Sequence, residues 1–300
     1  MAAKKNCKGE PAMRFMPLPG SMRQPCASPG RLTEMFYQTE SYDDQHRPLH
    51  KRALVYLPCG YDESPEQHYP VLYMMHGGGG DENEVFGGLE GRSGFKAMLD
   101  NAIASGHVAP MIVIAPTYTV EGFEAARRSI DVAVLLTHRF PTELTRDLIP
   151  AVDAAFRTLP DRRQRAFSGF SMGGETTWSV LANASREIWC CAPLSGDYWI
   201  KGLKGGKDFP AETAAALVEQ LHTSGAAPED VRVLAFTGDK DIAFEALQPM
   251  VEALADTDFF TLADQPDGGN LTWCLKENGW HTYDDCWEYL FLALPHLFGG

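Results

Sequence analysis

The sequence lacks the features that define several large classes of protein. No segment approaches the run of about eighteen apolar residues that a membrane-spanning helix needs. Positive charge is scarce, because 26 lysines and arginines stand against 40 aspartates and glutamates and leave a formal net charge of −14 at pH 7. A surface of this sign repels nucleic acid and anionic membranes. We expect neither as a partner, and a neutral or small-molecule substrate fits the charge better.

A secretion signal is also missing from the first residues, MAAKKNCKGEPAMRFMPLPG, which contain basic side chains but no apolar core. The sequence leaves the location open, since the protein is extracellular if a leader has been removed and cytoplasmic otherwise. The oligomeric state is open as well.

The cysteines show neither zinc-ligand spacing nor a complete disulfide framework, because their number is odd and no Cys-x-x-Cys occurs. We expect most of them to be buried thiols, and we expect no metal ion or cofactor. Cys190 and Cys191 are adjacent on a predicted strand, where they would point to opposite faces of a sheet. The full set is Cys7, Cys26, Cys59, Cys190, Cys191, Cys274 and Cys286.

Strand-like and helix-like segments alternate along most of the chain. Several of the strand-like runs are apolar throughout, as expected for strands buried on both faces of a sheet. These runs are 52–58, 71–76, 111–116, 165–170, 189–194, 231–238 and 271–276, and the helical patterns are 95–105, 142–156, 174–184, 211–225, 242–255 and 284–298. The alternation predicts an α/β fold with a mostly parallel central sheet and helices on both faces.

One domain is enough for this pattern. Residues 1–30 are rich in proline, glycine, serine and methionine and read as an irregular lead-in. Residues 31–300 contain no internal repeat and no linker that would divide them. We therefore expect a single domain over residues 31–300.

The stretch RAFSGFSMGGETTW places Ser171 between Gly169 and Gly173. A Gly-x-Ser-x-Gly pattern alone does not separate a catalytic nucleophile from a glycine-rich turn. Here it follows a predicted strand and precedes a predicted helix, which is the setting that holds a nucleophile on a sharp, strained turn. The context favours Ser171 as a nucleophile.

A serine hydroxyl needs a base to take its proton and an acid to orient that base. His281 follows a predicted strand downstream of Ser171 and is our candidate for the base. Asp241, after the strand that ends in Gly238, is the first candidate for the acid, and Asp239 is the second. Either aspartate could instead form a turn or cap a helix. The order Ser, Asp, His matches the chain order of α/β-hydrolases.

The glycine run HGGGG, from His76 to Gly80, follows another predicted strand. Its bare backbone can turn amides toward the oxyanion of a tetrahedral intermediate. We expect the amides of Gly78 and Met172 to form this oxyanion hole, with His76 fixing the loop. A phosphate cradle is the alternative, but no Gly-Lys-Ser/Thr follows the run, and the acidic stretch 81–84 would repel phosphate.

Five segments together resemble the feruloyl esterases of carbohydrate esterase family 1, particularly the esterase modules attached to bacterial xylanases. These segments are RALVYLPCGYDESPEQHYPVLYMMHGGGGDENEVF, RAFSGFSMGGETTWSV, CAPLSGDYW, AFTGDKDIAF and NGWHTYDDCW. The resemblance extends from about Glu34 to Phe298 and implies an α/β-hydrolase fold. It also implies that Ser171 is the nucleophile, Asp241 the acid and His281 the base.

The resemblance further implies that the SGDYW loop lies near the substrate, while residue type suggests aromatic side chains for a pocket that takes a planar acyl group. The segment 118–138, often a variable loop in such esterases, shows no pattern that can be aligned. The expected substrate-binding residues are Gly79, Tyr118, Asp197, Tyr198, Trp199 and Trp280.

The implied activity is a serine carboxylesterase that releases ferulate or p-coumarate from feruloylated arabinoxylan or its oligosaccharides. The same triad would serve an acetylxylan esterase, because acyl size is determined by the pocket and not by the nucleophile. An S-formylglutathione hydrolase shares the fold. A non-catalytic, hydrolase-like module that binds polysaccharide is the alternative from another class.

Overall fold

The computed structural model describes residues 13–299 except 44 and 119–129. Within them, nine strands form one sheet in the order β1-β2-β4-β3-β5-β6-β7-β9-β8. The first two pairings, β1 with β2 and β2 with β4, are antiparallel, and all the others are parallel. The strands are β1 (Arg31–Glu40), β2 (Pro48–Leu57), β3 (Val71–Met75), β4 (Ile112–Ala115), β5 (Arg165–Phe170), β6 (Cys190–Leu194), β7 (Arg232–Gly238), β8 (Leu262–Ala263) and β9 (Leu271–Lys276).

Seven of these strands coincide with the predicted runs, and the mostly parallel α/β fold is confirmed. Every residue of β3, β5 and β6 is buried, which explains their lack of polar alternation. The prediction missed β1 and the two-residue β8. In β1 the buried residues Met35, Tyr37 and Thr39 alternate with more exposed ones, as in an edge strand with one solvated face.

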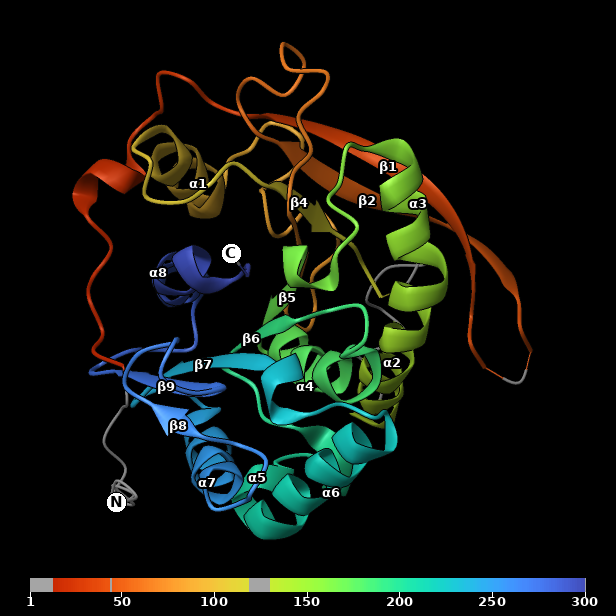
Figure 1. The fold of residues 1–300 in the computed structure, drawn as a ribbon, viewed down its shortest axis with the longest axis vertical. Coiled ribbons are helices and arrows are strands. Elements are labelled where there is room, and N and C mark those ends of the chain that lie inside the picture. Colours follow the sequence, from red (N-terminus) through yellow and green to blue (C-terminus); the bar gives the residue numbers. More distant parts are fainter. Residues whose placement is uncertain (1–12, 44, 119–129, 300) are drawn as a thin grey trace.

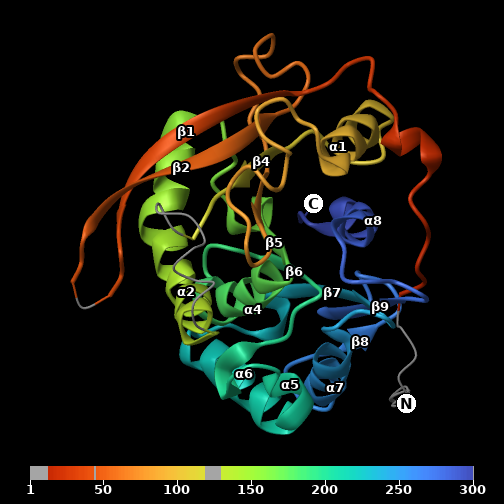
Figure 2. The same cartoon turned by 180° about the vertical axis from the view of Figure 1, so that it is seen from behind.

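Helices cover both faces of the sheet (Figures 1 and 2). On one face lie α1 (Gly94–Ala104) and α8 (Tyr283–Ala293), whose buried side chains share one apolar cluster. On the other face lie α2 (Ile130–Glu143), α3 (Ile149–Ala155), α4 (Met172–Ala184), α6 (Pro210–Thr223) and α7 (Phe244–Ala255), which share the second cluster. A short helix, α5 (Gly205–Asp208), packs against α6 and α7.

The helix predicted at 142–156 is divided. It comprises the end of α2, a single π-helical turn at Leu144–Leu148, and α3. A spacing of four residues is wider than the 3.6 residues of an α-helical turn, and the wide π turn keeps Leu144 and Leu148 on the buried side. The apolar stripe therefore faces the sheet as predicted, while α2 itself was not predicted.

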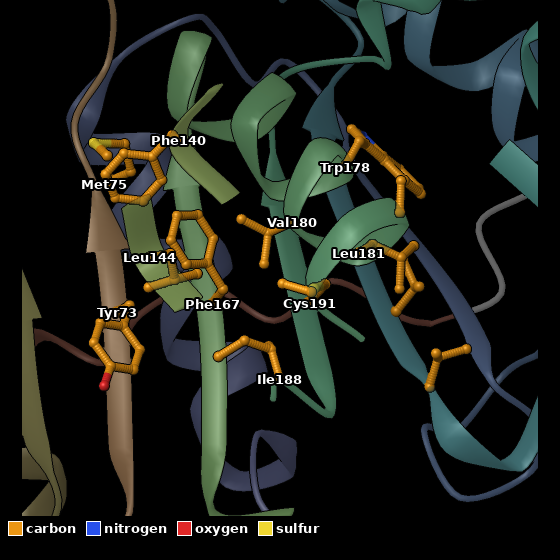
Figure 3. Packing of buried hydrophobic residues seen from close by; sticks show 14 of the residues in the cluster. Tyr73, Met75, Phe140, Leu144, Phe167, Trp178, Val180, Leu181, Ile188 and Cys191 are labelled. Atoms are coloured by element: carbon orange, nitrogen blue, oxygen red, sulfur yellow. The ribbon is translucent and has the colours of Figure 1, made fainter. Parts of the chain in front are cut away.

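The core beside α4 is built from side chains that interlock between the sheet and the helices (Figure 3). Phe167 of β5 meets Phe140 of α2, with ring centroids 5.9 Å apart. Trp178 of α4 is fully buried, and its indole N–H donates to the carbonyl of Gly196 at 2.8 Å. This packing fixes the start of α4, at the position where the Gly-x-Ser-x-Gly motif turns, relative to the sheet.

Cys190 and Cys191 contribute to different apolar clusters, which confirms that they point to opposite faces of the sheet. Burial raises the pKa of the Cys190 thiol to about 12 and that of Cys191 well above its usual range, so both are unreactive. The six cysteines in the described part of the chain are free, and four of them are buried; Cys7 lies outside it.

Residues 13–30 pack along the side of the sheet that carries α1 and α8, seen in red in Figure 1. The Met13 amide donates to the carbonyl of Trp273 in β9 at 2.8 Å, and Arg23 pairs with Glu288 of α8 at 2.7 Å. The 3-10 turn Gly20–Arg23 is the regular element of this segment. None of the described helices combines the length and apolar character that crossing a membrane requires.

Candidate active site

Ser171 occupies the turn between β5 and α4. Its backbone has φ 56° and ψ −119°, a conformation that is strained for a residue with a side chain. The Ser171 amide donates to the carbonyl of Leu194 in β6 at 2.9 Å, and the Ser171 carbonyl accepts from the Glu175 amide at 3.0 Å. These two bonds from neighbouring elements hold the strained turn and lift the side chain above the carboxyl end of the sheet.

Glycine is required on both sides of Ser171 because the backbone passes close to itself here. A Cβ added to Gly169 would overlap the backbone of Gly173. A Cβ added to Gly173 would lie 2.5 Å from the carbonyl oxygen of Met75 and 2.8 Å from that of His76. The motif therefore brings the turn within van der Waals distance of the loop after β3.

His281 and Asp241 lie on the loops that follow the adjacent strands β9 and β7. The Nε2 atom of His281 is 2.8 Å from the Oγ atom of Ser171, and its Nδ1 atom is 2.7 Å from Oδ1 of Asp241. The side chain of Asp241 is fully buried, whereas that of His281 is 22% exposed. Three residues far apart in the sequence thus form one hydrogen-bonded relay from a buried carboxylate to a solvent-accessible hydroxyl.

The structure distinguishes the two candidate aspartates. Oδ1 of Asp241 also accepts from the Ala243 amide at 2.8 Å, a bond that fixes the carboxylate toward His281. Asp239 instead lies beside Lys240, with 3.8 Å between its Oδ2 atom and the lysine nitrogen. The contact with His281 is made by Asp241, the first candidate.

The loop that carries His281 is anchored to α8. Oδ2 of Asp285 accepts from the Trp280 amide at 2.7 Å and from the Thr282 hydroxyl at 3.1 Å. Lys276, at the end of β9, pairs with Asp285 and also with Glu288 at 2.6 Å. The residues before and after His281 are therefore both hydrogen-bonded to the carboxylate of Asp285.

The glycine loop after β3 is held from both sides. Nδ1 of His76 donates to the Gly77 carbonyl at 2.7 Å, and its Nε2 lies 3.1 Å from the Thr117 hydroxyl. Burial lowers the pKa of His76 to about 4, so the ring is neutral and serves to fix the loop. The Gly77 amide donates to the hydroxyl of Tyr283 in α8 at 3.0 Å.

Gly78 and Gly79 follow at the exposed part of this loop, and Gly79 has φ 95°, which favours glycine. The Gly78 amide has no acceptor among the described residues. Met172 is the first residue of α4, where backbone amides have no partner within the helix. Both amides lie on elements that meet at Ser171, since Gly173 packs against Met75 and His76.

The predicted substrate-binding residues are placed very differently. Tyr118 is buried under the first turn of α4, where its hydroxyl bonds to the Met172 carbonyl at 3.1 Å and to Thr176 at 2.6 Å. Tyr198 is fully buried and donates to Gln220 at 2.7 Å. Trp280, by contrast, is 60% exposed.

Asp197 and Trp199 are also almost completely buried. Oδ2 of Asp197 accepts from the Gly206 amide at 2.9 Å, which ties the SGDYW loop to α5. The carboxylate of Asp197 and the hydroxyl of Tyr198 thus tie this loop to α5 and α6.

Glu175, one turn after Ser171 in α4, is a residue that sequence reasoning missed. Its side chain is buried, and Oε2 has no hydrogen-bond partner within the described part of the chain. Burial, reinforced by the charge of Asp197, raises the pKa of Glu175 well above its usual range. Glu175 therefore holds its proton more strongly than an exposed glutamate does. The sequence gives one sign of this residue, because Glu175 directly follows the glycines of the Gly-x-Ser-x-Gly motif.

Because the pKa of Glu175 is raised in the folded protein, we expect its replacement by glutamine to stabilise the fold by an amount that depends on pH. Above a pH of about 4.5 the unfolded chain releases the Glu175 proton while the folded protein keeps it, so stability falls by about 1.4 kcal/mol per pH unit until the folded pKa is reached. Glu175→Gln removes this loss. We expect a higher melting temperature than wild type at pH 7 to 8 and an equal one near pH 4. Exposed Glu212→Gln is the control in the same thermal scan. A difference between Glu175→Gln and wild type that does not vary with pH would contradict the raised pKa of Glu175.

Comparison with known proteins places this geometry in a family. The family model described as Esterase matches residues 50–258, more than half of the chain. Endo-1,4-beta-xylanase Y of Acetivibrio thermocellus is 31% identical over 301 residues, which cover 97% of this chain and 25% of that protein. An endo-1,4-beta-xylanase/feruloyl esterase of Xylanibacter ruminicola is 36% identical over 163 residues, covering 53% of this chain and 20% of that protein. The chain thus spans a quarter or less of the length of these relatives.

Among solved structures, a serine-to-alanine mutant of the feruloyl esterase module from Clostridium thermocellum, complexed with sinapinate, is 31% identical with a TM-score of 0.80. The match covers 97% of this chain and 96% of that chain. The resemblance found in the sequence motifs is confirmed over nearly the whole chain. This chain therefore belongs to the esterase family and is a carboxylic ester hydrolase with an α/β-hydrolase fold, related to the feruloyl esterases of carbohydrate esterase family 1.

Proposed function

We propose that Ser171, His281 and Asp241 are the catalytic triad of this hydrolase and that its substrates are feruloyl or p-coumaroyl esters of plant cell-wall arabinoxylan or its oligosaccharides. The main support is the hydrogen-bonded relay, in which His281 lies 2.8 Å from the Ser171 hydroxyl and 2.7 Å from the Asp241 carboxylate. The serine at its end lies in a strained turn. In this relay His281 is the base and Asp241 fixes its tautomer, because a carboxylate at Nδ1 leaves Nε2 free to accept the serine proton.

In the first step, Nε2 of His281 takes the proton as Oγ of Ser171 attacks the ester carbonyl. The tetrahedral intermediate collapses when the protonated ring returns a proton to the ester's alcohol oxygen, and the alcohol leaves. Water then enters, His281 removes its proton, and attack on the acyl-enzyme releases the acid and restores the serine. The charge on the ring is stabilised throughout by the buried carboxylate of Asp241.

The amides of Gly78 and Met172 form the oxyanion hole in this scheme. They lie on two elements that contact each other through Gly173, and the N-terminal end of α4 adds its favourable partial charge toward an anion. Donors fixed in advance lower the barrier because they need no reorganisation when the charge develops.

Tyr283 supports this arrangement, so its hydroxyl should matter for turnover. Tyr283→Phe keeps the ring packed 4.8 Å from Phe170 but removes the acceptor for the Gly77 amide. Loss of this hydrogen bond to the glycine loop after β3, which carries Gly78, is expected to lower kcat by about two- to tenfold. The matched control is Tyr61→Phe, which also removes a hydroxyl that accepts a backbone amide, here that of Arg157 at 3.1 Å. Tyr61 packs on Tyr69, just before β3 begins, whereas the glycine loop follows the other end of that strand. Equal kcat values for the two variants would contradict the role of Tyr283.

The proposed acyl group is supported by the relatives. A similar module is known in complex with sinapinate, a close analogue of ferulate, and another relative is named a feruloyl esterase. The deciding experiment compares release of ferulate, p-coumarate and acetate from feruloylated arabinoxylan and acetylated xylan. Efficient deacetylation without release of hydroxycinnamate would identify an acetylxylan esterase and reject the proposed substrate. Lack of hydrolysis of any ester, together with binding to polysaccharide, would reject catalysis altogether.

A further inference from the structure

The two most exposed large hydrophobic side chains in the described part of the chain are neighbours of the triad. Ile242, which follows Asp241, is 67% exposed, and Trp280, which precedes His281, is 60% exposed. Single exposed apolar side chains are common, but two of them directly beside two residues of the relay indicate a surface that contacts a ligand. Neither side chain takes part in the hydrogen bonds of the relay itself.

The loops that carry these residues are joined and rigid. The Lys240 amide donates to the carbonyl of Gly279 at 3.0 Å, so the chain just before Ile242 is bonded to the residue just before Trp280. The Trp280 amide is fixed by Asp285 at 2.7 Å. A Cβ on Gly238 would overlap the backbone of Gly279, which shows how closely the two loops pack. The loops that carry the two apolar side chains are therefore fixed to each other by backbone contacts.

The chemistry of the proposed reaction determines which part of the substrate lies there. Nε2 of His281 must deliver its proton to the alcohol oxygen of the ester. The alcohol group therefore lies on the same side of Ser171 as His281. Phe170 packs on the His281 ring, with centroids 4.6 Å apart, and is buried. The alcohol must therefore leave the relay toward solvent, over the loops that carry Trp280 and Ile242.

We propose that Trp280 and Ile242 form a platform that binds the sugar residue of the ester's alcohol. The C–H face of a neutral furanose or pyranose packs on an indole ring and an aliphatic side chain, and its hydroxyls remain in water. A protein partner would need a far larger surface, about 800 Å² on each side. The platform rests on the proposed function and adds specificity for a glycosyl alcohol over a simple one.

The test uses two esters of the same acid, methyl ferulate and a feruloylated arabinoxylo-oligosaccharide. Trp280→Ala and Ile242→Ala are expected to lower the ratio of kcat/KM for the sugar ester to kcat/KM for the methyl ester, by about three- to tenfold for Trp280→Ala, and chiefly through KM. Trp280→Phe should restore most of the ratio. The control is Phe36→Ala, which removes an aromatic side chain of 53% exposure from β1, at the opposite end of the sheet order from β9.

A ratio that stays the same in Trp280→Ala, or that falls as much in Phe36→Ala, would overturn the platform. A second measurement keeps this result separate from the identity of the acyl group. The Ser171→Ala protein is titrated with an unesterified arabinoxylo-oligosaccharide by isothermal titration calorimetry, a readout that does not depend on the Trp280 ring. Binding that weakens at least threefold when Trp280→Phe is exchanged for Trp280→Ala supports the platform even if ferulate is not the acyl group. Lack of sugar binding, or equal binding by both, rejects it.

Discussion

Ser171→Ala is expected to lower kcat on hydroxycinnamoyl esters by about 10⁴-fold or more, because without the hydroxyl no acyl-enzyme can form. The residual rate would come from the oxyanion hole and from binding alone. The fold should survive, since the Ser171 side chain is bonded to His281 and its backbone conformation is held by the Leu194 carbonyl and the Glu175 amide. We expect the melting temperature to remain within about 2 °C of wild type.

The control for this variant lies in the same helix. Ser179 of α4 is buried, and its hydroxyl has no hydrogen-bond partner in the part of the chain that the structure describes, so Ser179→Ala removes no contact of that kind. Its kcat should remain near that of wild type. Labelling with a fluorophosphonate provides an independent measurement, with an adduct expected on Ser171 in wild type and Ser179→Ala but not in Ser171→Ala. Substantial turnover by a folded Ser171→Ala protein would reject the proposed mechanism.

The order and spacing of the elements that carry the relay could be predicted because they depend on local pattern. Strands β5, β7 and β9 are short, mostly apolar or β-prone runs without regular polar alternation, and each relay residue follows one of them. Parallel strands bring their carboxyl ends to the same edge of a sheet, so the order Ser, Asp, His in the sequence already implies that the three residues meet.

The choice between Asp239 and Asp241 could not be made from pattern alone. Both lie in one short turn after β7, and the side chain that reaches His281 is selected by bonds within that turn, from the Asp241 amide to the Gly238 carbonyl at 3.2 Å and from the Ala243 amide to the Asp241 carboxylate at 2.8 Å. Such bonds depend on the path of the whole turn and not on the two residue types.

Burial of the SGDYW loop was also inaccessible to the sequence. Aromatic side chains in a loop are equally suited to bind a ligand or to fill a gap in the core. Tyr198 fills such a gap because α5, α6 and α7 close over it, with its amide 3.3 Å from the Met250 sulfur and its hydroxyl bonded to Gln220. The position of these helices is a tertiary property. Trp280 remains exposed because its loop is held by backbone bonds and leaves the ring free.

Gly173→Ala is expected to have the largest effect after loss of the nucleophile. The added Cβ would lie 2.5 Å from the Met75 carbonyl oxygen and 2.8 Å from that of His76, and backbone atoms of a central strand cannot move away cheaply. The turn that carries Ser171 and the loop that carries Gly78 would be pushed apart, and a displacement of about 1 Å costs about 100-fold in rate.

We expect Gly173→Ala to lower kcat/KM by about 100-fold or more and to reduce the free energy of unfolding by about 1–3 kcal/mol, the usual cost of overpacking. Both are measured by ester hydrolysis and urea denaturation. Gly20→Ala is the matched control, because a Cβ added there meets nothing within 4 Å and the residue has no positive φ. If Gly173→Ala were folded and as active as Gly20→Ala, close contact between the serine turn and the glycine loop would not be needed for catalysis. The assignment of the Gly78 and Met172 amides to one oxyanion hole would then fail, since that assignment depends on the contact.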